Sequence, residues 1–421
     1  MTPVESVASE PAHTVDSGRR ARQSRFAWTL VDQVISSATS AVLSLLVAHR
    51  LSQQGFGAYA LAYGVYTFAI GLSVNAGTSA LQVRYADKSP EQFRSAAGRA
   101  QGTVAGIGIV IGLIATLAGV GLGGGVGRAL ICLGVGLPAL VVVDAWRTVL
   151  KSSGRPRGAA GVDALFACGQ TLGLVLLLRS HDLRAGTAIV SWAIAALVAG
   201  LVGARLARTL PKLGSAWSWF RETRDLSGVL VLEYLIVLGA VQIAQIAIAS
   251  IGGVRVTGAL RGALVLLGPI NLIVFTATGF AVPELVRLQT KDVHRMRRAA
   301  VAISGALIIL TFAWGTMLLL IPNHLGTVLL GDTWAKAQHT LLPSIIGAAG
   351  QCGAVGPGSV MMVLNQPKWG LRLSAIVAPV TIAAGIVGVS LGGAEGAAWG
   401  LAAAQWSALP AWYGILARKL R

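Results

Sequence analysis

The sequence predicts an all-α integral membrane protein with about twelve transmembrane helices arranged as two six-helix lobes. Three observations carry this prediction. The 421 residues are 54% hydrophobic and only 12% charged, with a mean hydropathy of +0.70. The apolar runs have room for helices of about 20 residues, the length that crosses the ~30 Å hydrocarbon core of a bilayer. The connections between these runs alternate between rich and poor in lysine and arginine.

The composition excludes soluble enzymes, fibres and disordered chains, because soluble domains carry about 25% charged residues. The formal charge of +18 is typical of a nucleic-acid-binding protein. That function needs basic residues gathered on a folded polar domain, and no polar stretch is long enough to form one. We therefore expect no nucleic-acid partner. Arginine outnumbers lysine, and glycine and alanine are abundant, which is typical of a GC-rich bacterial genome.

The first element is a polar stretch at residues 1–24, which we expect to be a disordered cytoplasmic tail. It does not resemble a signal peptide, because the apolar run after it is about 25 residues long and has no cleavage site. Hydropathy then predicts twelve helices. They cover residues 26–50, 57–81, 98–122, 128–150, 159–179, 186–207, 228–250, 258–282, 298–322, 338–363, 369–391 and 394–417.

The basic residues predict the orientation of these helices, because lysine and arginine are retained on the cytoplasmic side. With both termini placed in the cytoplasm, 27 of the 34 basic residues fall on the inner side. Adding or removing one helix would scramble this alternation. The outer side keeps Arg50, Arg128, Arg179, Arg184, Arg255, Arg261 and Lys336.

The longest inner connection, residues 208–227, separates a predicted N-terminal lobe at 25–207 from a C-terminal lobe at 228–421. Its aromatic residues next to arginines are typical of an interfacial helix, and a solvated loop is the alternative. The residues concerned are Trp217, Trp219, Phe220, Arg221 and Arg224.

A weak internal repeat supports the two lobes. A shift of 201 residues pairs Asp32 with Glu233, and Gly57-Ala58 with Gly258-Ala259. After a further slip, Ala80 to Arg84 aligns with Pro283 to Arg287. Parallel repeats about an axis normal to the membrane are common in transporters.

Six segments of the sequence are informative together: Trp28 to Ser37, Val47 to Leu61, Gly258 to Ala263, Leu267 to Pro269, Pro283 to Arg287 and Leu330 to Trp334. They resemble segments of the Wzx-type polysaccharide and O-antigen flippases of the MATE/MOP exporter superfamily. The resemblance extends over nearly the whole chain, but its motifs are structural rather than catalytic. Ser52-Gln53-Gln54 replaces the Gly-Pro-acid stretch that is usual in that family.

The resemblance implies a two-lobed helical bundle around a central cavity in a bacterial plasma membrane. Its implied function is to move a lipid-linked oligosaccharide, carried on polyprenyl pyrophosphate, from the inner to the outer leaflet by alternating access. A MATE-like, cation-coupled drug or metabolite antiporter is the main alternative. A membrane glycosyltransferase or polymer ligase is a weaker alternative, because the predicted outer connections are short and poor in acids. We therefore expect no enzymatic activity and no cofactor.

Acidic residues within membrane spans are costly, and they are by default functional candidates. Asp32 lies about 9 Å into the first span, at 1.5 Å per residue, and Glu233 occupies the matching place in the seventh. Asp144 and Arg147 are three residues apart and should pair on one helix face. These four residues are candidates for a cytoplasmic gate or for coupling to a proton or sodium ion. Alternatively, they and the other shallow acids, Asp163 and Glu284, only neutralise inner arginines.

Arg261 is predicted one turn inside the outer end of the eighth span, far from the inner arginines. Because guanidinium groups bind phosphate oxygens in pairs, the pyrophosphate of a polyprenyl carrier is a candidate ligand. The alternative is that this side chain extends to the outer headgroups.

Amide side chains occupy the predicted midplane, where they suit a hydroxyl-rich substrate better than a cationic drug. Asn75, Gln242, Gln245 and Asn271 are predicted to bind substrate together with Arg261. The alternative role for each amide is a hydrogen bond between helices. The other predicted midplane amides are Gln170, Gln351 and Gln405.

Other motifs predict no catalytic or metal site. Cys132, Cys168 and Cys352 fall in apolar runs without paired spacing, and the histidines show no ligand spacing. The glycine-rich stretch 121–127 lacks the Gly-Lys-Ser/Thr of a phosphate loop and is predicted to be a flexible outer turn. The basic inner face should contact anionic lipid headgroups.

Overall fold

The computed structural model describes residues 44–85, 88–271, 293–364 and 367–419, with the single positions 273, 274, 277, 285 and 288. All regular elements among these residues are helices, so the predicted all-α class is confirmed for this part of the chain. Asp32, Glu284 and Arg287, with the tail and most of the first predicted span, lie outside the described residues.

The first helices form what we call the N-terminal group. Residues 44–50 are helical and precede it. The group comprises α2 (Gln53–Ser73), the π-helical turn η1 (Val74–Thr78), α3 (Ser79–Arg84), α4 (Pro90–Leu122), α5 (Gly124–Ser152), α6 (Pro156–Arg179) and α7 (Ala185–Ala207).

The later helices form the C-terminal group, and a helix from the predicted linker joins the two groups. The connecting elements are η2 (Leu213–Ser215), α8 (Ala216–Tyr234) and the π-helical turn η3 (Leu235–Gly239). The C-terminal group comprises α9 (Ala240–Leu266), α11 (Val293–Leu319), α12 (Asn323–Leu330), η4 (Gly331–Thr333), α13 (Trp334–Val363) and α14 (Pro367–Lys419).

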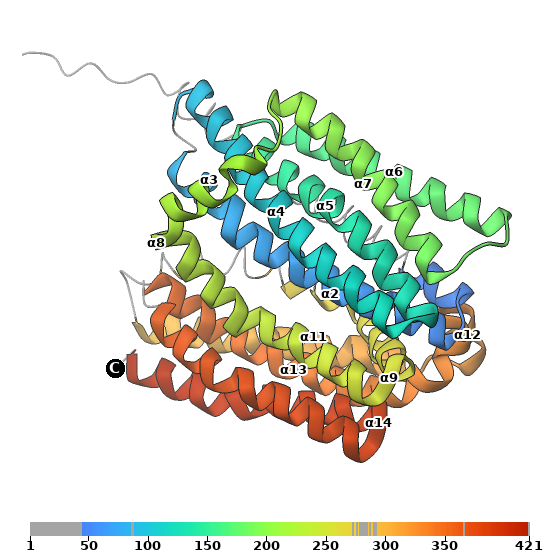
Figure 1. The fold of residues 1–421 in the computed structure, drawn as a ribbon. Helices are drawn as coiled ribbons and strands as arrows, with labels where there is room; N and C mark the ends of the chain where they lie inside the picture. The colour runs from blue at the N-terminus through green and yellow to red at the C-terminus, as the bar shows by residue number, and fades with distance from the viewer. Residues whose placement is uncertain are drawn as a thin grey trace, which may run out of the picture.

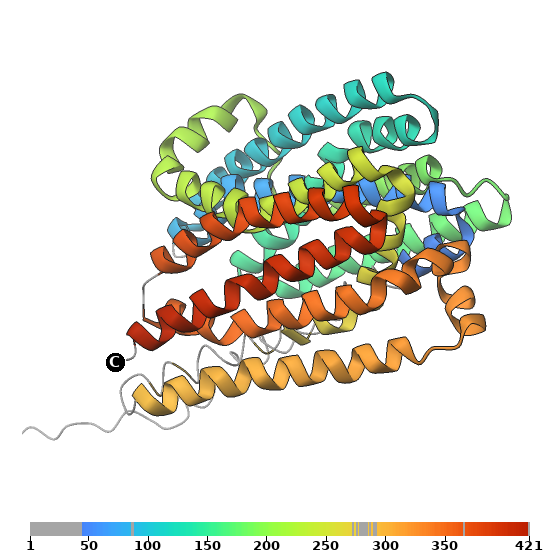
Figure 2. The same cartoon turned by 90° about the horizontal axis from the view of Figure 1, so that it is seen from below.

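Local sequence explains where several helices begin and bend. Ser89 caps α4 through a capping box with Gln92, and Pro90 occupies the first helical position, where its missing N–H costs nothing. Gly253, at φ 78°, bends α9. Gly393, at φ 57°, turns α14 back on itself, so that α14 is two antiparallel arms (Figure 2). Both conformations favour glycine over residues with a Cβ.

Small residues allow the helices to pack closely. A Cβ on Gly112 of α4 would lie 2.3 Å from the carbonyl oxygen of Gly134 on α5, so these backbones are nearly in contact. The two arms of α14 approach each other in the same way at Gly388 and Gly396. The high glycine content therefore serves the close helix packing that membrane proteins use in place of a hydrophobic driving force.

The two groups lie side by side and meet along α2 and α9 (Figure 1). We name the ends of the molecule after two residues. The Arg50 end carries Arg50, the α4–α5 turn at Gly123 and α12. The Glu222 end carries Tyr85, the start of α8 and the C-terminal end of α14, on the left of Figure 1.

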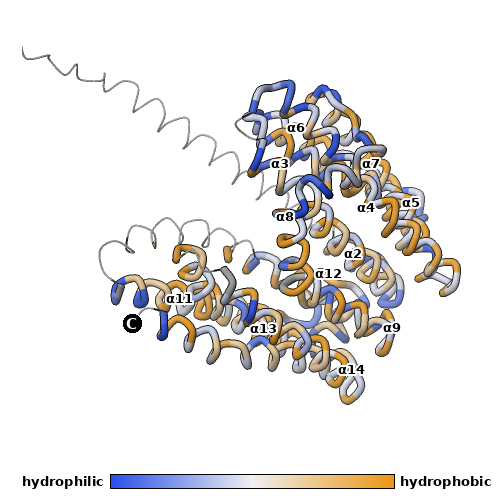
Figure 3. The backbone as a smooth tube through the Cα atoms, turned by 60° about the vertical axis from the view of Figure 1, so that its left-hand side comes forward, coloured by the Kyte–Doolittle hydropathy of each residue, from blue (hydrophilic) through white to orange (hydrophobic). Residues whose placement is uncertain are grey.

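Eight of the described helices are long and apolar enough to cross a membrane. Apolar residues run along their lengths, and hydrophilic residues gather at α3, α8 and the start of α11 (Figure 3). The spans predicted from residue 57 onward coincide with helices, except that the eighth is interrupted near Gly268-Pro269 and lies partly outside the described residues. The number of twelve, the cytoplasmic termini and the lobe boundaries stay predictions.

The predicted linker differs from expectation in one respect. α8 begins at Ala216 and runs through the predicted boundary at residue 228, continuing through η3 into α9. The linker and the seventh predicted span are therefore one nearly continuous helix. Trp219 was expected at a membrane interface, yet it is completely buried, whereas Trp217 is 67% exposed.

Candidate functional site

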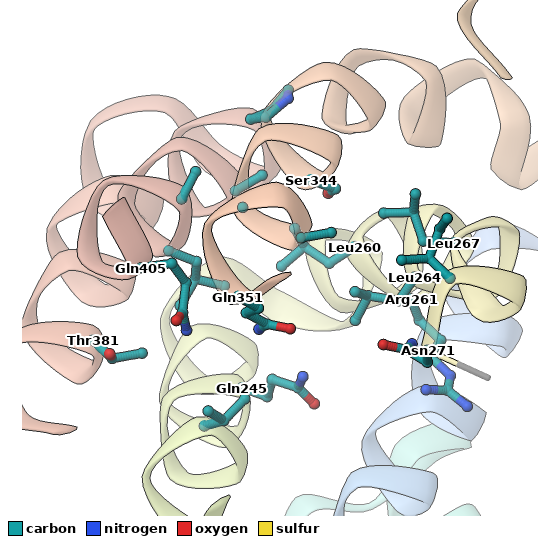
Figure 4. A pocket seen from close by; sticks show the side chains of 18 of the residues that line it. Gln245, Leu260, Arg261, Leu264, Leu267, Asn271, Ser344, Gln351, Thr381 and Gln405 are labelled. Carbon is teal, nitrogen blue, oxygen red and sulfur yellow. The ribbon is translucent and has the colours of Figure 1, made fainter. Parts of the chain in front are cut away.

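A cavity of about 120 Å³ lies in the C-terminal group and faces α2. Helices α9, α13 and both arms of α14 supply its walls, and Ala60 of α2 closes one side. Eight polar residues line it, and Figure 4 labels all of them except Thr257. They are Gln245, Thr257, Arg261, Asn271, Ser344, Gln351, Thr381 and Gln405.

Arg261 is the single charged residue among the described residues that line this cavity. Its Cζ lies 3.9 Å from the centre of the Tyr63 ring on α2, a cation–π contact between the two helix groups. Its Nε is buried without a hydrogen-bond partner in the described part of the chain. Because an unsatisfied buried donor costs about 1–3 kcal/mol, and more when charged, this atom is suited to an anionic ligand.

Arg261 lies deeper than the sequence predicted. It was placed one turn inside the start of a span, but the second arm of α9 starts directly after Gly253. Arg261 therefore stands about 12 Å along that arm. The side chain does not extend to the headgroups, because it turns towards Tyr63 and the cavity.

Three of the five residues predicted to bind substrate come together here. Arg261, Gln245 and Asn271 all line the cavity, and Gln351 and Gln405, also predicted at the midplane, join them. Each amide offers both donors and an acceptor, which is the chemistry that recognises hydroxyl groups. The hydroxyls of Ser344, Thr257 and Thr381 were not singled out from the sequence, because isolated hydroxyl residues in apolar helices carry no distinguishing pattern.

The other two predicted substrate residues lie elsewhere. Gln242 is on α9 against α2, where its Oε1 would lie 3.9 Å from a Cβ on Gly64. Asn75 lies in η1 and donates from Nδ2 to the carbonyl oxygen of Gly71, at 2.8 Å. Neither lines the cavity described above. The hydrogen bond of Asn75 is within its own helix and stabilises the π-helical turn.

The predicted pair of Asp144 and Arg147 is present and belongs to a larger cluster. Arg147 Nη1 donates to Asp144 Oδ1 at 3.0 Å. Arg147 also forms an ion pair with Asp163 of α6, whose side chain is only 8% exposed. One arginine therefore lies between two carboxylates inside the N-terminal group. This cluster lies on α5 and α6, apart from the Arg261 cavity.

Of the two remaining candidates for gating or ion coupling, Glu233 lies within the described residues and Asp32 does not. Glu233 lies on α8 and is half-buried, one residue before Tyr234. Tyr234 Oη donates to the carbonyl oxygen of Phe68 on α2 at 3.1 Å, so Glu233 lies at the junction of the two groups. Asp32, its predicted counterpart, lies outside the described residues.

A polar cluster that the sequence did not reveal ties α8 to the N-terminal group. Arg99 of α4 donates to both carboxylate oxygens of Glu222, at 2.7 and 3.1 Å. Tyr85 Oη donates to the same carboxylate at 2.7 Å. These bonds from Arg99 and then Tyr85 lower the pKa of Glu222, and the bond to Glu222 raises the pKa of Tyr85. Arg84 pairs with Asp225 beside them.

Trp219 anchors α8 next to this cluster. Its ring forms a cation–π contact with Arg99, whose Cζ is 5.1 Å from the ring centre. Its Nε1 donates to the carbonyl oxygen of Gly77 in η1 at 3.1 Å. The pairs in this region are more than 100 residues apart in sequence, so no local motif could have predicted them.

The two groups are in close contact at the Arg50 end. A Cβ on Gly57 would lie 1.7 Å from the carbonyl oxygen of Val254, which means that the two backbones touch. His49 Nδ1 lies 3.2 Å from the carbonyl oxygen of Thr327. A Cβ on Gly331 would lie 2.4 Å from the carbonyl oxygen of His49. This end of the interface is therefore closed.

No protein-family model matches the sequence, and no curated protein matches it. Solved structures do. An inward-facing multidrug resistance transporter of the MATE family in the MOP superfamily matches with a TM-score of 0.69 at 13% identity, over 94% of this chain and 98% of that one. The lipid II flippase MurJ, in an inward closed conformation, matches with a TM-score of 0.71 at 10% identity, over 93% and 87%.

A third similar structure is a MOP superfamily transporter from Pyrococcus furiosus, described as having a binding pocket of reverse polarity. It matches with a TM-score of 0.53 at 12% identity, over 94% of this chain and 95% of that one. At such identities the similarity establishes the fold alone. Together with the apolar helices, it identifies a multi-pass membrane protein. The chain has the fold of the MOP-superfamily transporters.

Proposed function

We propose that this protein is a transporter that moves a glycan linked to polyprenyl pyrophosphate from the inner to the outer leaflet of a bacterial plasma membrane. The observation that carries the proposal is the cavity around Arg261. It combines one buried guanidinium group, whose Nε is unpartnered among the described residues, with amides and hydroxyls. A pyrophosphate would satisfy the guanidinium group, and sugar hydroxyls would satisfy the amides.

The charge of the cavity supports an anionic substrate over a cationic one. Its described lining holds one arginine and no carboxylate. A cationic drug would need deep carboxylates or aromatic faces for its charge. The lipid II flippase MurJ, which has the same fold, is named for a lipid substrate.

The contact between Arg261 and Tyr63 suggests how binding would be linked to alternating access. These residues belong to different helix groups, and the ring lies 3.9 Å from the guanidinium carbon. A phosphate that binds Arg261 would compete with, or add to, a contact worth about 0.5–2 kcal/mol. Substrate binding would thereby change the free energy of the closed interface, as alternating access requires.

A cation-coupled drug or metabolite antiporter remains the second candidate, and one observation favours it. Tyr63, Tyr66 and Trp192 form an aromatic cluster in which the Tyr66 and Trp192 ring centres are 4.3 Å apart. Aromatic faces of this kind bind organic cations. In either function, the Asp144–Arg147–Asp163 cluster and Glu233 are our candidates for coupling to a proton or sodium ion, with Asp32 as a further one.

The experiment compares two arginines on the same helix. Arg261 lines the cavity, whereas Arg255 is exposed and does not. The purified protein is reconstituted into vesicles with a fluorescent polyprenyl-pyrophosphate-linked oligosaccharide, and both binding and flipping are measured. Arg261→Gln should weaken binding about tenfold or more, equivalent to 1.4 kcal/mol, and stop flipping. Arg255→Gln should behave like the wild type.

Two results would count against the proposal. Equal binding by Arg261→Gln and the wild type would remove the phosphate role of Arg261. Saturable binding of a lipophilic cation, with no binding of the lipid-linked glycan, would favour the antiporter. Arg261→Lys separates charge from geometry, because lysine retains the charge but cannot bind phosphate through two parallel hydrogen bonds.

A further inference from the structure

An apolar groove of about 670 Å³ runs along the outer surface of α5 and α7, and it shares no lining residue with the Arg261 cavity. One wall is α5 from Ile131 to Trp146, and the other is α7 from Val190 to Ala204. Leu210 and Pro211 lie at its far end, towards the Glu222 end. Exposed apolar residues are expected on any membrane helix, so exposure alone gives this surface no function. Its concave shape is what needs an explanation.

Small residues produce the concavity. Gly136 and Ala193 meet at the floor, where a Cβ on Gly136 would lie 2.4 Å from the Cβ of Ala193. Larger side chains, such as Val135 and Leu197, form the rims and are more than half exposed. From Ile131 to Trp146 the groove is about 22 Å long at 1.5 Å per residue. One leaflet of the hydrocarbon core is about 15 Å thick, so an acyl chain fits along the groove.

The groove opens at the Arg50 end into a second cavity of about 650 Å³. The two cavities share Ile131, Cys132 and Val190 in their linings, so they are continuous. The second cavity is polar and cationic. Arg50, from the segment before α2, Arg128 of α5 and Arg184 before α7 all line it.

The charges in this cavity do not cancel. Arg184 pairs with Asp182 at 3.3 Å, and Asp182 is the sole carboxylate among the described lining residues. Arg128 donates from Nε to the carbonyl oxygen of Gly124 at 3.2 Å, which leaves the two terminal nitrogens of its guanidinium group. The formal charge of the lining is therefore +2. Ser52 and Thr187 add hydroxyl groups at the same rim.

We propose that this composite site binds an anionic phospholipid of the bilayer, with its phosphate among Arg50, Arg128 and Arg184 and one acyl chain in the groove between α5 and α7. The two cavities match this ligand at both ends, because the lining is cationic and polar where the headgroup would lie and apolar along the length of the chain. Basic pockets between transmembrane helices bind anionic headgroups in this way. A zwitterionic lipid would offer the same chain but no net negative charge.

The site also touches the region where the helix groups meet. Its lining includes Arg50, Leu51 and Gln54. The neighbouring His49 contacts Thr327 of the C-terminal group. A bound lipid would therefore hold residues 50–54, at the start of α2, against α5 and α7 while the Arg50 end is closed. In the orientation predicted from the basic residues, the lipid belongs to the outer leaflet. The proposal does not depend on the transported substrate.

The experiment measures lipid retention by native mass spectrometry. The full chain is reconstituted into nanodiscs of equal parts phosphatidylglycerol and phosphatidylcholine and released in the gas phase. The wild type should retain phosphatidylglycerol in preference to phosphatidylcholine. The double variant Arg128→Gln/Arg184→Gln should lose the preference and bind about tenfold less phosphatidylglycerol. The reason is that each arginine near an anionic headgroup strengthens the binding of that lipid. The matched control is Arg179→Gln/Arg255→Gln, which removes the same charge outside the cavity.

A second variant tests the groove separately from the charge. Leu197 lines the groove and is 54% exposed, so Leu197→Trp should fill it without disturbing the packed side of α7. This variant should retain less of both lipids and unfold at the wild-type temperature. Phosphatidylglycerol retained equally by the arginine double variant and the wild type would overturn the proposal. So would an equal loss in the double variant and its control.

Discussion

Gly57 of α2 and Gly258 of α9 face each other across the interface between the two helix groups. A Cβ on Gly258 would lie 3.2 Å from the backbone nitrogen of Gly57 and 3.3 Å from its Cα. These are the two glycines that the internal repeat pairs in the sequence. Repeats related by an axis normal to the membrane bring equivalent residues together only near that axis. A contact between these two glycines is therefore what the predicted repeat would produce with its axis close to the pair.

The first prediction concerns closure at the Arg50 end. In Gly57→Ala, the new Cβ would lie 1.7 Å from the carbonyl oxygen of Val254 on the backbone of α9, which cannot rotate away. We expect the two groups to separate at this end. The measurement is the distance between spin labels at Arg128→Cys and Leu325→Cys in a background without the native cysteines, and it should increase.

The control for this experiment is Gly161→Ala in α6, where a Cβ would meet no atom within 4 Å. Its label distance should match the wild type. An unchanged distance in Gly57→Ala would mean that α9 shifts locally and that the contact does not hold the groups together.

Much of the fold could be predicted from the sequence, because bilayer thickness, hydropathy and helix periodicity act locally. The breaks inside the helices could not. Gly253 and Gly393 bend their helices, yet each is one glycine among the 53 in the chain. The π-helical turns η1 and η3 have no distinct sequence pattern. The residue before η3, Tyr234 of α8, donates to α2, which is distant in the sequence.

The residues of the candidate site also fall into those that the sequence could predict and those that it could not. Arg261, Gln245 and Asn271 could be selected because charge and amides are rare in apolar helices. Asn75 met the same criterion, but its amide bonds within its own helix, which composition cannot distinguish. The cluster at Glu222 was missed because its partners lie in distant parts of the chain, such as Arg99.

The second prediction concerns the anchoring of α8. Glu222→Ala removes the acceptor of three hydrogen bonds and leaves Arg99 without its carboxylate. Because the pair is partly exposed, we expect the free energy of unfolding to fall by only about 1 kcal/mol. Thermal unfolding in detergent measures the loss. Glu395→Ala, an exposed acid in the turn of α14, is the control and should leave the unfolding temperature unchanged.

The third prediction is a pH dependence at the same place. Arg99 and then Tyr85 hold the pKa of Glu222 below its ordinary value of 4.5. The ion pair therefore contributes its full stability above pH 4.5, and this stability is lost as the pH falls through the lower pKa of the folded state. Spin labels at Arg94→Cys and Arg221→Cys should move apart over that range. In Glu222→Gln, the same labels should show no pH step; a step there would assign the change to another group.

The fourth prediction concerns the buried cluster of Arg147. Arg147→Gln leaves Asp144 and Asp163 without the arginine that lies between them, and Asp163 is only 8% exposed. We expect a loss of about 3 kcal/mol in the free energy of unfolding. Adding Asp163→Asn should recover part of that loss, because it removes the charge of the buried carboxylate that Arg147 contacts in the wild type. If the double variant were less stable than Arg147→Gln, the cluster would not be held by charge compensation.

The fifth prediction compares two tryptophans of α8. Trp219 is completely buried and donates to the carbonyl oxygen of Gly77 in η1, whereas Trp217 is 67% exposed. Trp219→Phe keeps an aromatic ring but removes this donor, and the loss of one hydrogen bond between α8 and η1 should cost about 0.5–1.5 kcal/mol. It should also increase hydrogen exchange over residues 213–227. Trp217→Phe should change neither the unfolding temperature nor the exchange. Equal effects of the two substitutions would show that the ring of Trp219, and not its hydrogen bond to η1, positions α8.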